Sequence, residues 1–167
     1  MPSTYTPITS TTLTTTASSL TFSGIPGIYT DLIIVVSASV DSDGDLRYRI
    51  NGDSSSNYSG TIAWGTGSSA GSTRVSNVTS GITNSYGGFT TTLGGSVQIL
   101  QFLNYANTTT YKTILSRTNT ATGGVDVTAG LWRSTSAITS ITMAKNSAMG
   151  GTFQIGSTYT LYGIKAA

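Results

Sequence analysis

Apolar and polar positions alternate over short runs along most of this chain, which is typical of β-strands. The longest apolar run covers residues 32–36, is rich in β-branched side chains, and predicts a central strand that is covered on both faces. Residues 46–50 alternate apolar and basic side chains, so they predict a neighbouring strand with one face in solvent. Between them, residues 41–45 hold three aspartates and Gly44, which favours a hairpin turn that pairs the two strands.

Further strand-length runs follow at short intervals, and no segment shows the helical period. They cover residues 18–23, 96–105, 112–118, 125–131, 137–145 and 157–164, with two shorter strands near 61–64 and 72–78. Residues 79–95 predict a long loop of the kind that often has a functional or interface role. The pattern therefore predicts an all-β protein, a jelly-roll-like antiparallel β-sandwich of about eight to ten strands.

The first residues differ from the rest of the chain. Residues 1–16 are rich in threonine and contain Pro7, and Leu13 is one of the few apolar anchors. Because proline cannot donate to a strand ladder, this segment predicts an extended N-terminal arm or an edge strand. Residues 17–167 show no internal repeat and no domain boundary, so they predict a single β-sandwich domain.

Charge is scarce in this sequence. Only 8% of the residues are charged and the net charge is +2, whereas charged residues make up roughly a quarter of an average globular protein. The polar surface must therefore consist mainly of Ser, Thr, Asn and Gly, which also disfavour helices. A surface with few charges and with open strand edges tends to self-associate, so we expect the protein to be buried permanently in a larger assembly.

The residue types that perform most acid–base and nucleophilic catalysis are missing, since the chain contains no histidine, cysteine or glutamate. Six aspartates remain, of which three lie in one predicted turn. The other three, Asp31, Asp53 and Asp126, show no motif that would bring two carboxylates together as an acid–base pair. The sequence therefore predicts a protein that is not an enzyme and that needs no cofactor.

One pattern resembles a metal site. Asp41, Asp43 and Asp45 alternate as the first ligands of a calcium loop do. However, Gly44 takes the fourth position of that loop instead of the sixth, and Gly52 stands where the bidentate glutamate belongs. The mismatch favours a solvated turn, with the three aspartates as candidates for a weakly held ion only.

The basic side chains are dispersed. Arg47 and Arg49 share one strand face, but the remaining cations are scattered, whereas nucleic-acid binding needs a clustered basic footprint. No apolar run approaches the ~18 residues of a membrane span, and no targeting segment is apparent at residues 1–5. We therefore expect neither a nucleic acid nor a membrane as partner.

Large aromatic and apolar side chains are candidates for contacts with a partner. Tyr48, Trp64 and Trp132 could form a sugar-binding platform, although aromatic residues serve as core or subunit-contact anchors as well. The candidates for a protein interface are Tyr5, Leu13, Tyr58, Trp64, Tyr86, Phe89 and Trp132.

Several strings resemble small virion proteins of tailed bacteriophages, over about residues 4–164. They are GIPGIYTDL at 24–32, RYRINGD at 47–53, NYS at 57–59, NTTTYKT at 107–113, GLWRS at 130–134 and YTLYGI at 159–164. The resemblance implies a multimeric β-sandwich subunit on the outside of a phage particle. Members of this family are either head decoration (cement) proteins or modules of tail fibres.

The size of the chain favours the first role. A tail fibre needs a shaft or an attachment domain, whereas one sandwich leaves only residues 4–16 for attachment. We therefore expect a cement protein on the outer surface of the head, a homotrimer that clamps neighbouring copies of the major capsid protein, with the arm and residues 79–95 as contacts. The alternatives are a tail-fibre or receptor-binding module that recognises a host glycan, and a carbohydrate-binding domain outside a virion.

Overall fold

The computed structural model describes residues 4–146 and 151–165, and all regular elements in these two ranges are β-strands. There are twelve, a little more than the sequence predicted. They are β1 (Tyr5–Thr12), β2 (Ser19–Phe22), β3 (Asp31–Ser37), β4 (Leu46–Ile50), β5 (Tyr58–Gly65), β6 (Ala70–Val78), β7 (Gly81–Ile82), β8 (Ser96–Phe102), β9 (Lys112–Thr120), β10 (Gly124–Trp132), β11 (Ile141–Lys145) and β12 (Thr158–Ile164).

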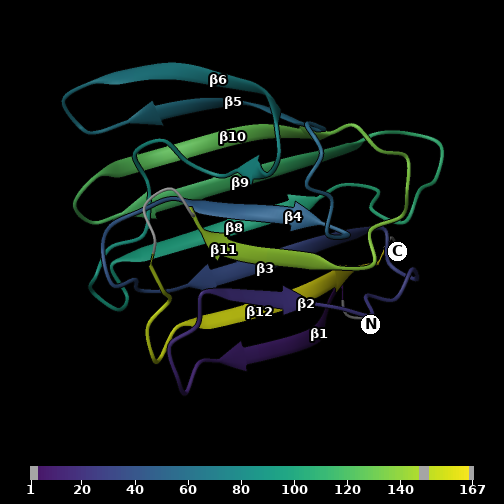
Figure 1. The fold of residues 1–167 in the computed structure, drawn as a ribbon, viewed down its shortest axis with the longest axis horizontal. Coiled ribbons are helices and arrows are strands. Elements are labelled where there is room, and N and C mark those ends of the chain that lie inside the picture. Colours follow the sequence, from purple (N-terminus) through teal and green to yellow (C-terminus); the bar gives the residue numbers. More distant parts are fainter. Residues whose placement is uncertain (1–3, 147–150, 166–167) are drawn as a thin grey trace.

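The strands form two antiparallel sheets that pack face to face, so the predicted β-sandwich is confirmed. An eight-stranded sheet has the order β1-β12-β3-β8-β9-β10-β5-β6, and a four-stranded sheet has the order β2-β11-β4-β7. Figure 1 shows the smaller sheet in front of the larger one, with β5 and β6 extending beyond it. We call the face of the large sheet that meets the small sheet its inner face and the opposite one its outer face.

The strand predicted as central lies within the large sheet. β3 pairs with β12 on one side and β8 on the other. Its inner-face side chains Leu32, Ile34 and Val36 are fully buried, and Ile33 on the outer face is buried as well. The β-branched run is therefore covered on both faces over most of its length, as predicted.

The predicted hairpin between β3 and β4 is wrong, because the two strands lie in different sheets. β4 pairs with β11 and β7, and the residues after β3 carry the chain across from one layer to the other. Ala38 and Val40 of this crossing segment are buried, and the amide of Val40 donates to the carbonyl oxygen of Thr90 at 3.0 Å. The apolar character thus continues past β3 because the connection runs through the core instead of turning at the surface.

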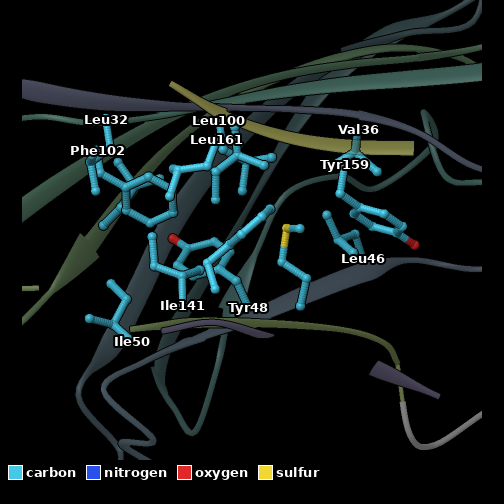
Figure 2. Packing of buried hydrophobic residues seen from close by; sticks show 14 of the residues in the cluster. Leu32, Val36, Leu46, Tyr48, Ile50, Leu100, Phe102, Ile141, Tyr159 and Leu161 are labelled. Carbon is cyan, nitrogen blue, oxygen red and sulfur yellow. The ribbon is translucent and has the colours of Figure 1, made fainter. Parts of the chain in front are cut away.

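Side chains from both sheets interlock in the core (Figure 2). Tyr48 of β4 packs edge to face against Phe102 of β8, with ring centroids 5.7 Å apart and planes at 82°. Leu46 and Ile50 are buried on the same face of β4, while Arg49 on the other face is exposed, which confirms the predicted alternation. Each buried side chain of this size contributes roughly 1.5–3 kcal/mol by leaving water.

Beyond the small sheet, the inner face of β8, β9 and β10 becomes polar. The segment after β7 fills this space through Thr83, whose carbonyl oxygen accepts hydrogen bonds from Ser116 Oγ at 3.2 Å and Thr128 Oγ1 at 2.8 Å. The Thr83 hydroxyl group donates in turn to Gln98 Oε1 at 3.0 Å. Residues 79–95 are largely irregular, as predicted, but residues 81–84, 87, 89 and 90 are buried, whereas residues 85–86 and 91–94 are exposed.

The N-terminal segment is an edge strand. β1 pairs with β12, and its register shifts between Pro7, which pairs with Tyr162, and Thr9, which pairs with Leu161, so that Ile8 has no partner in the ladder. Ile8 and Leu13 pack against the core. Tyr5–Thr12 thus forms an edge strand, which is one of the two forms that the sequence predicted for residues 1–16.

Candidate docking surface

Three of the predicted interface residues lie in the core. Tyr58, Phe89 and Trp132 are almost completely buried, so their proposed contact with a partner is corrected. Tyr58 and Trp132 are directly opposite each other on β5 and β10, on the inner face of the large sheet. Tyr48 is buried too, so neither it nor Trp132 offers a platform for a sugar.

The hydroxyl group of buried Tyr58 joins the two sheets. It accepts a hydrogen bond from the amide of Ile50 at 3.0 Å and donates to the carbonyl oxygen of Asp53 at 3.0 Å. Burial raises the pKa of Tyr58 to about 12, so the group stays protonated and can donate at neutral pH. Tyr58 therefore has a structural role, because its hydroxyl group links β5 to β4 and to the turn after it.

The other four candidates lie at separate places. Tyr5 is exposed at the β1 edge, where its ring packs edge to face on Tyr162 with centroids 6.4 Å apart. Leu13 packs against the core. Only Trp64 and Tyr86 are brought together, with ring centroids 4.3 Å apart. The seven predicted residues do not form one surface.

The three alternating aspartates do not converge on an ion. Asp41 accepts a hydrogen bond from Lys145 Nζ at 3.0 Å, and this bond lowers the pKa of the Asp41 carboxyl group. Asp45 instead accepts from Asn84 Nδ2 at 2.9 Å. Within the described ranges no three acidic, histidine or cysteine side chains gather as metal ligands would, so the weak metal candidates Asp41, Asp43 and Asp45 are corrected.

Two further aspartates hold loops in place. Asp31 accepts from the amide of Asn104 at 2.8 Å and from Gln101 Nε2 at 3.1 Å, which fixes the turn after β8. Asp126 is buried on the inner face and accepts from the amide of Tyr86 at 3.1 Å. The carboxylates are thus distributed over the fold as hydrogen-bond acceptors.

Sequence reasoning missed the buried lysines. Lys112 is fully buried, and its ammonium group donates to the carbonyl oxygens of Asn107 at 2.6 Å, Thr110 at 2.8 Å and Thr135 at 3.2 Å. Burial lowers the pKa of Lys112. The alternation contained the signal, because Lys112 and the buried Ile114 occupy the same face of β9. This lysine organises two loops and is not a surface charge.

The outer face of β9 and β10 exposes a group of apolar side chains. Leu115, Val125 and Val127 are 44%, 58% and 52% exposed, and the exposed Ala129 lies directly opposite Leu115. We call these four residues the outer apolar patch. Arg117 lies opposite Val127 and is the charged group within this part of the face.

β10 turns its polar side chains toward the core and its valines toward solvent. An amphipathic strand normally turns its apolar positions toward the core. In β10 the polar residues Asp126 and Thr128 face inward, where Thr128 bonds to Thr83, and the valines at 125 and 127 face solvent. The residues at positions 79–90 supply the polar partners that make this orientation stable, and the apolar side is left outside.

A shallow groove of about 450 Å³ adjoins the patch on the outer face. Its walls include Ala129 and Leu131 of β10, Thr61 of β5 and Arg74 of β6. Together the patch and the groove make a surface with hydroxyl groups, methyl groups and few charges, which can bind another protein by shape and by burial of apolar area.

No helix in residues 4–146 and 151–165 is long and apolar enough to cross a membrane. No protein-family model matches the chain, and no curated protein matches it. Among solved structures, the crystal structure of the Caenorhabditis elegans galectin LEC-6 aligns with 94% of this chain and 96% of the galectin chain, at 10% identity and a TM-score of 0.34. A likeness at this level shows neither function nor ligand. The sandwich assignment rests on the two sheets themselves.

Proposed function

We propose that this protein is a structural protein of a tailed-bacteriophage virion, a capsid decoration (cement) protein that docks on the outer surface of the head. The observation that carries this proposal is the inverted strand β10, which exposes Val125 and Val127 while it buries Asp126 and Thr128. The sequence resemblance to phage virion proteins supplies the identity of the partner, the major capsid protein.

The outer apolar patch suits permanent docking. Burial of apolar surface contributes about 25 cal/mol for each Å² removed from water, and the surrounding Thr and Ser hydroxyl groups can form short hydrogen bonds at the rim. Few charges need to be desolvated, since Arg117 lies beside the patch and Arg74 lines the adjoining groove. Each bound copy would stabilise the assembled shell by its own binding free energy.

Copies of this chain are the second expected partner. β6 ends the large sheet, and its residues are mostly exposed. An open edge of this kind can pair with another chain, which supports a homo-oligomer. The resemblance implies a multimer, and the trimer expected of the cement protein stays a prediction, to be checked by mass measurement in solution.

Docking is tested by incorporation into particles. Val127→Asp places a charge in the outer apolar patch and should greatly reduce the copies bound to purified heads. Ile155→Asp is the matched control, because Ile155 is also exposed but lies outside the patch, so normal occupancy is expected. Full occupancy of the Val127→Asp protein would contradict docking through this face.

The position of the protein on the particle separates the cement protein from the tail-fibre alternative. Immunogold labelling should place many copies over the head. Labelling confined to the tail, with a few copies per particle, would replace the cement role with that of a receptor-binding module.

A further inference from the structure

A second groove, of about 290 Å³, lies at the end of the sandwich where the hairpin between β9 and β10 approaches the start of β4. Its walls come from residues 43–45, residues 85–90 and residues 120–123. Tyr86, whose side chain is exposed, is one of the lining residues, and Asp43, Ser85 and Thr122 add polar residues to the lining. None of these groups takes part in the docking surface described above.

The backbone of Tyr86 is held by a buried carboxylate. Asp126 is 1% exposed, and it accepts hydrogen bonds from the amide of Tyr86 at 3.1 Å, from the amide of Gly87, and from the hydroxyl group of Thr118 at 3.3 Å. A buried carboxylate that loses such donors is costly, so these bonds fix the loop strongly. Tyr86 is therefore presented from a rigid position.

The ring of Tyr86 rests on a second aromatic ring. Trp64 lies on the inner face of β5 against Gly71 of β6, where a Cβ atom would come within 2.7 Å of Trp64 Cζ2. The other side of Trp64 meets Tyr86, with centroids 4.3 Å apart and planes at 40°. Glycine at position 71 thus makes room for Trp64, which supports Tyr86, and the Tyr86 side chain remains 47% exposed.

A carboxylate, that of Asp43, also belongs to the lining of the groove. The segment that carries Asp43 is fixed by a pair of backbone hydrogen bonds between Gly44 and Phe89, at 3.1 and 2.8 Å. In the described part of the chain the Asp43 side chain is exposed and makes no hydrogen bond or ion pair, unlike Asp41 and Asp45. Its acceptor oxygens are available to a ligand.

We infer that this groove binds a neutral sugar residue of a glycan. The face of an aromatic ring carries partial negative charge, so it attracts the C–H groups on the apolar face of a pyranose ring. Carboxylate and hydroxyl oxygens accept or exchange hydrogen bonds with sugar hydroxyl groups, and a charged acceptor makes the stronger bond. The carboxylate of Asp43 repels an acidic sugar, because both are negatively charged. The expected ligand is therefore a neutral sugar.

A peptide fits this groove less well. The backbone groups of the lining residues Gly44 and Phe89 are already paired with each other, so they are not open to an added strand. Of the two aromatic residues in the lining, Phe89 is buried and Tyr86 is exposed, so the groove offers one exposed aromatic side chain together with several hydroxyl groups. A single ring beside acceptors matches a sugar, which has one apolar face and a polar periphery.

The glycan site is independent of the docking proposal. Trp64 belongs to the inner face of the large sheet, because it pairs with buried Asp126, whereas Val127 and Leu115 lie on the outer face. A copy bound through the outer apolar patch would leave the groove open to solvent. The chain could therefore attach a particle to a polysaccharide while it stays docked on the shell.

The test is saturation-transfer NMR on the intact protein with maltose, cellobiose, lactose and N,N′-diacetylchitobiose, and with 3′-sialyllactose as the acidic comparison. At least one neutral sugar should bind with a Kd of the order of 1 mM. Tyr86→Ala should weaken this binding about tenfold, Asp43→Asn several-fold, and Tyr86→Phe less than about twofold. Tyr111→Ala is the matched control, because Tyr111 is exposed to a similar extent, 56% against 47% for Tyr86, but lies in the loop before β9.

Thermal unfolding of each variant shows whether the fold is retained. Binding that survives Tyr86→Ala, or that is lost equally in Tyr111→Ala, would overturn the proposal. Failure of all four neutral sugars to bind the unmodified protein would overturn it as well. If a peptide bound in the groove and no sugar gave a saturation-transfer signal, the site would be assigned to a protein partner instead.

Discussion

The indole Nε1 of Trp132 donates a hydrogen bond to Oδ2 of Asp53 over 2.7 Å, and this bond ties the end of β10 to the turn after β4. The same carboxylate accepts from Asn57 Nδ2 at 2.9 Å and from the amide of Ser55 at 2.8 Å. Burial raises the pKa of Asp53, but these hydrogen bonds outweigh it and lower the pKa to about 2. Trp132, predicted as a contact for a partner, is thus a structural anchor of the sandwich.

Stability should fall with acid as Asp53 is protonated. Because the pKa in the folded protein lies below the unfolded value of about 4, the carboxylate stabilises the fold above that value, and this contribution is lost as pH falls toward 2. Because solvent screens the partly exposed carboxylate, we expect the free energy of unfolding to fall by about 1 kcal/mol. The free energy of unfolding, measured by urea titration at about pH 6 and at about pH 2, gives this loss.

Asp53→Asn is the control for this prediction. The amide keeps an acceptor for Trp132 but does not titrate, so the variant should be less stable at neutral pH and should lose less stability on acidification. An unchanged pH profile in Asp53→Asn would show that other carboxylates dominate acid unfolding.

The buried Lys112 should contribute strongly to the stability of the fold. Lys112→Met keeps the length and packing of the side chain but leaves the carbonyl oxygens of Asn107, Thr110 and Thr135 without their shared donor. We expect a loss of about 2–3 kcal/mol in the free energy of unfolding, measured by urea titration. Arg117→Met, on the exposed face of the same strand, should change it by less than about 0.5 kcal/mol.

The strands predicted best are those in which apolar and polar residues alternate strictly. Alternation in residues 46–50 and 157–164 identified strands and their two faces, and both are confirmed in β4 and β12. The neighbouring runs at 96–105 and 112–118 are strands, β8 and β9, and they pair with each other in the sheet. Local sequence suffices where partners are close along the chain.

The sequence did not predict which strands pair when they lie far apart along the chain. The pairing of β3 with β12 and β8 depends on a strand far along the chain, whereas the pattern suggested the nearest neighbour, β4. Alternation also does not say which face turns inward, and in β10 the answer depends on Thr83, which supplies a partner for Thr128. The candidate docking surface follows from this inversion, so it became visible only in the fold.

Gly81 should not tolerate a side chain. The ring of Tyr48 lies over this glycine, and a Cβ atom there would overlap it, so Gly81→Ala must displace a buried core residue. We expect a loss of about 2–3 kcal/mol in the free energy of unfolding. Gly27→Ala is the control, because the nearest atom to its Cβ would be Ala106 Cβ at 3.9 Å. Equal stability of the two variants in thermal unfolding would contradict the packing of Tyr48 on β7.

Removal of β1 separates the two roles that the N-terminal segment could have. Deleting residues 1–12 would remove Ile8 from the core and leave the edge of β12 unpaired, so we expect a lower melting temperature and self-association in size-exclusion chromatography. Tyr5→Ser removes an exposed side chain and keeps the strand, so its stability should be nearly unchanged. If the deletion protein were instead monomeric and as stable as the full chain, but absent from phage heads, the segment would act as a docking arm. The ladder with β12 makes the first outcome the expected one, because an edge strand that buries a side chain belongs to the fold before it can serve a partner.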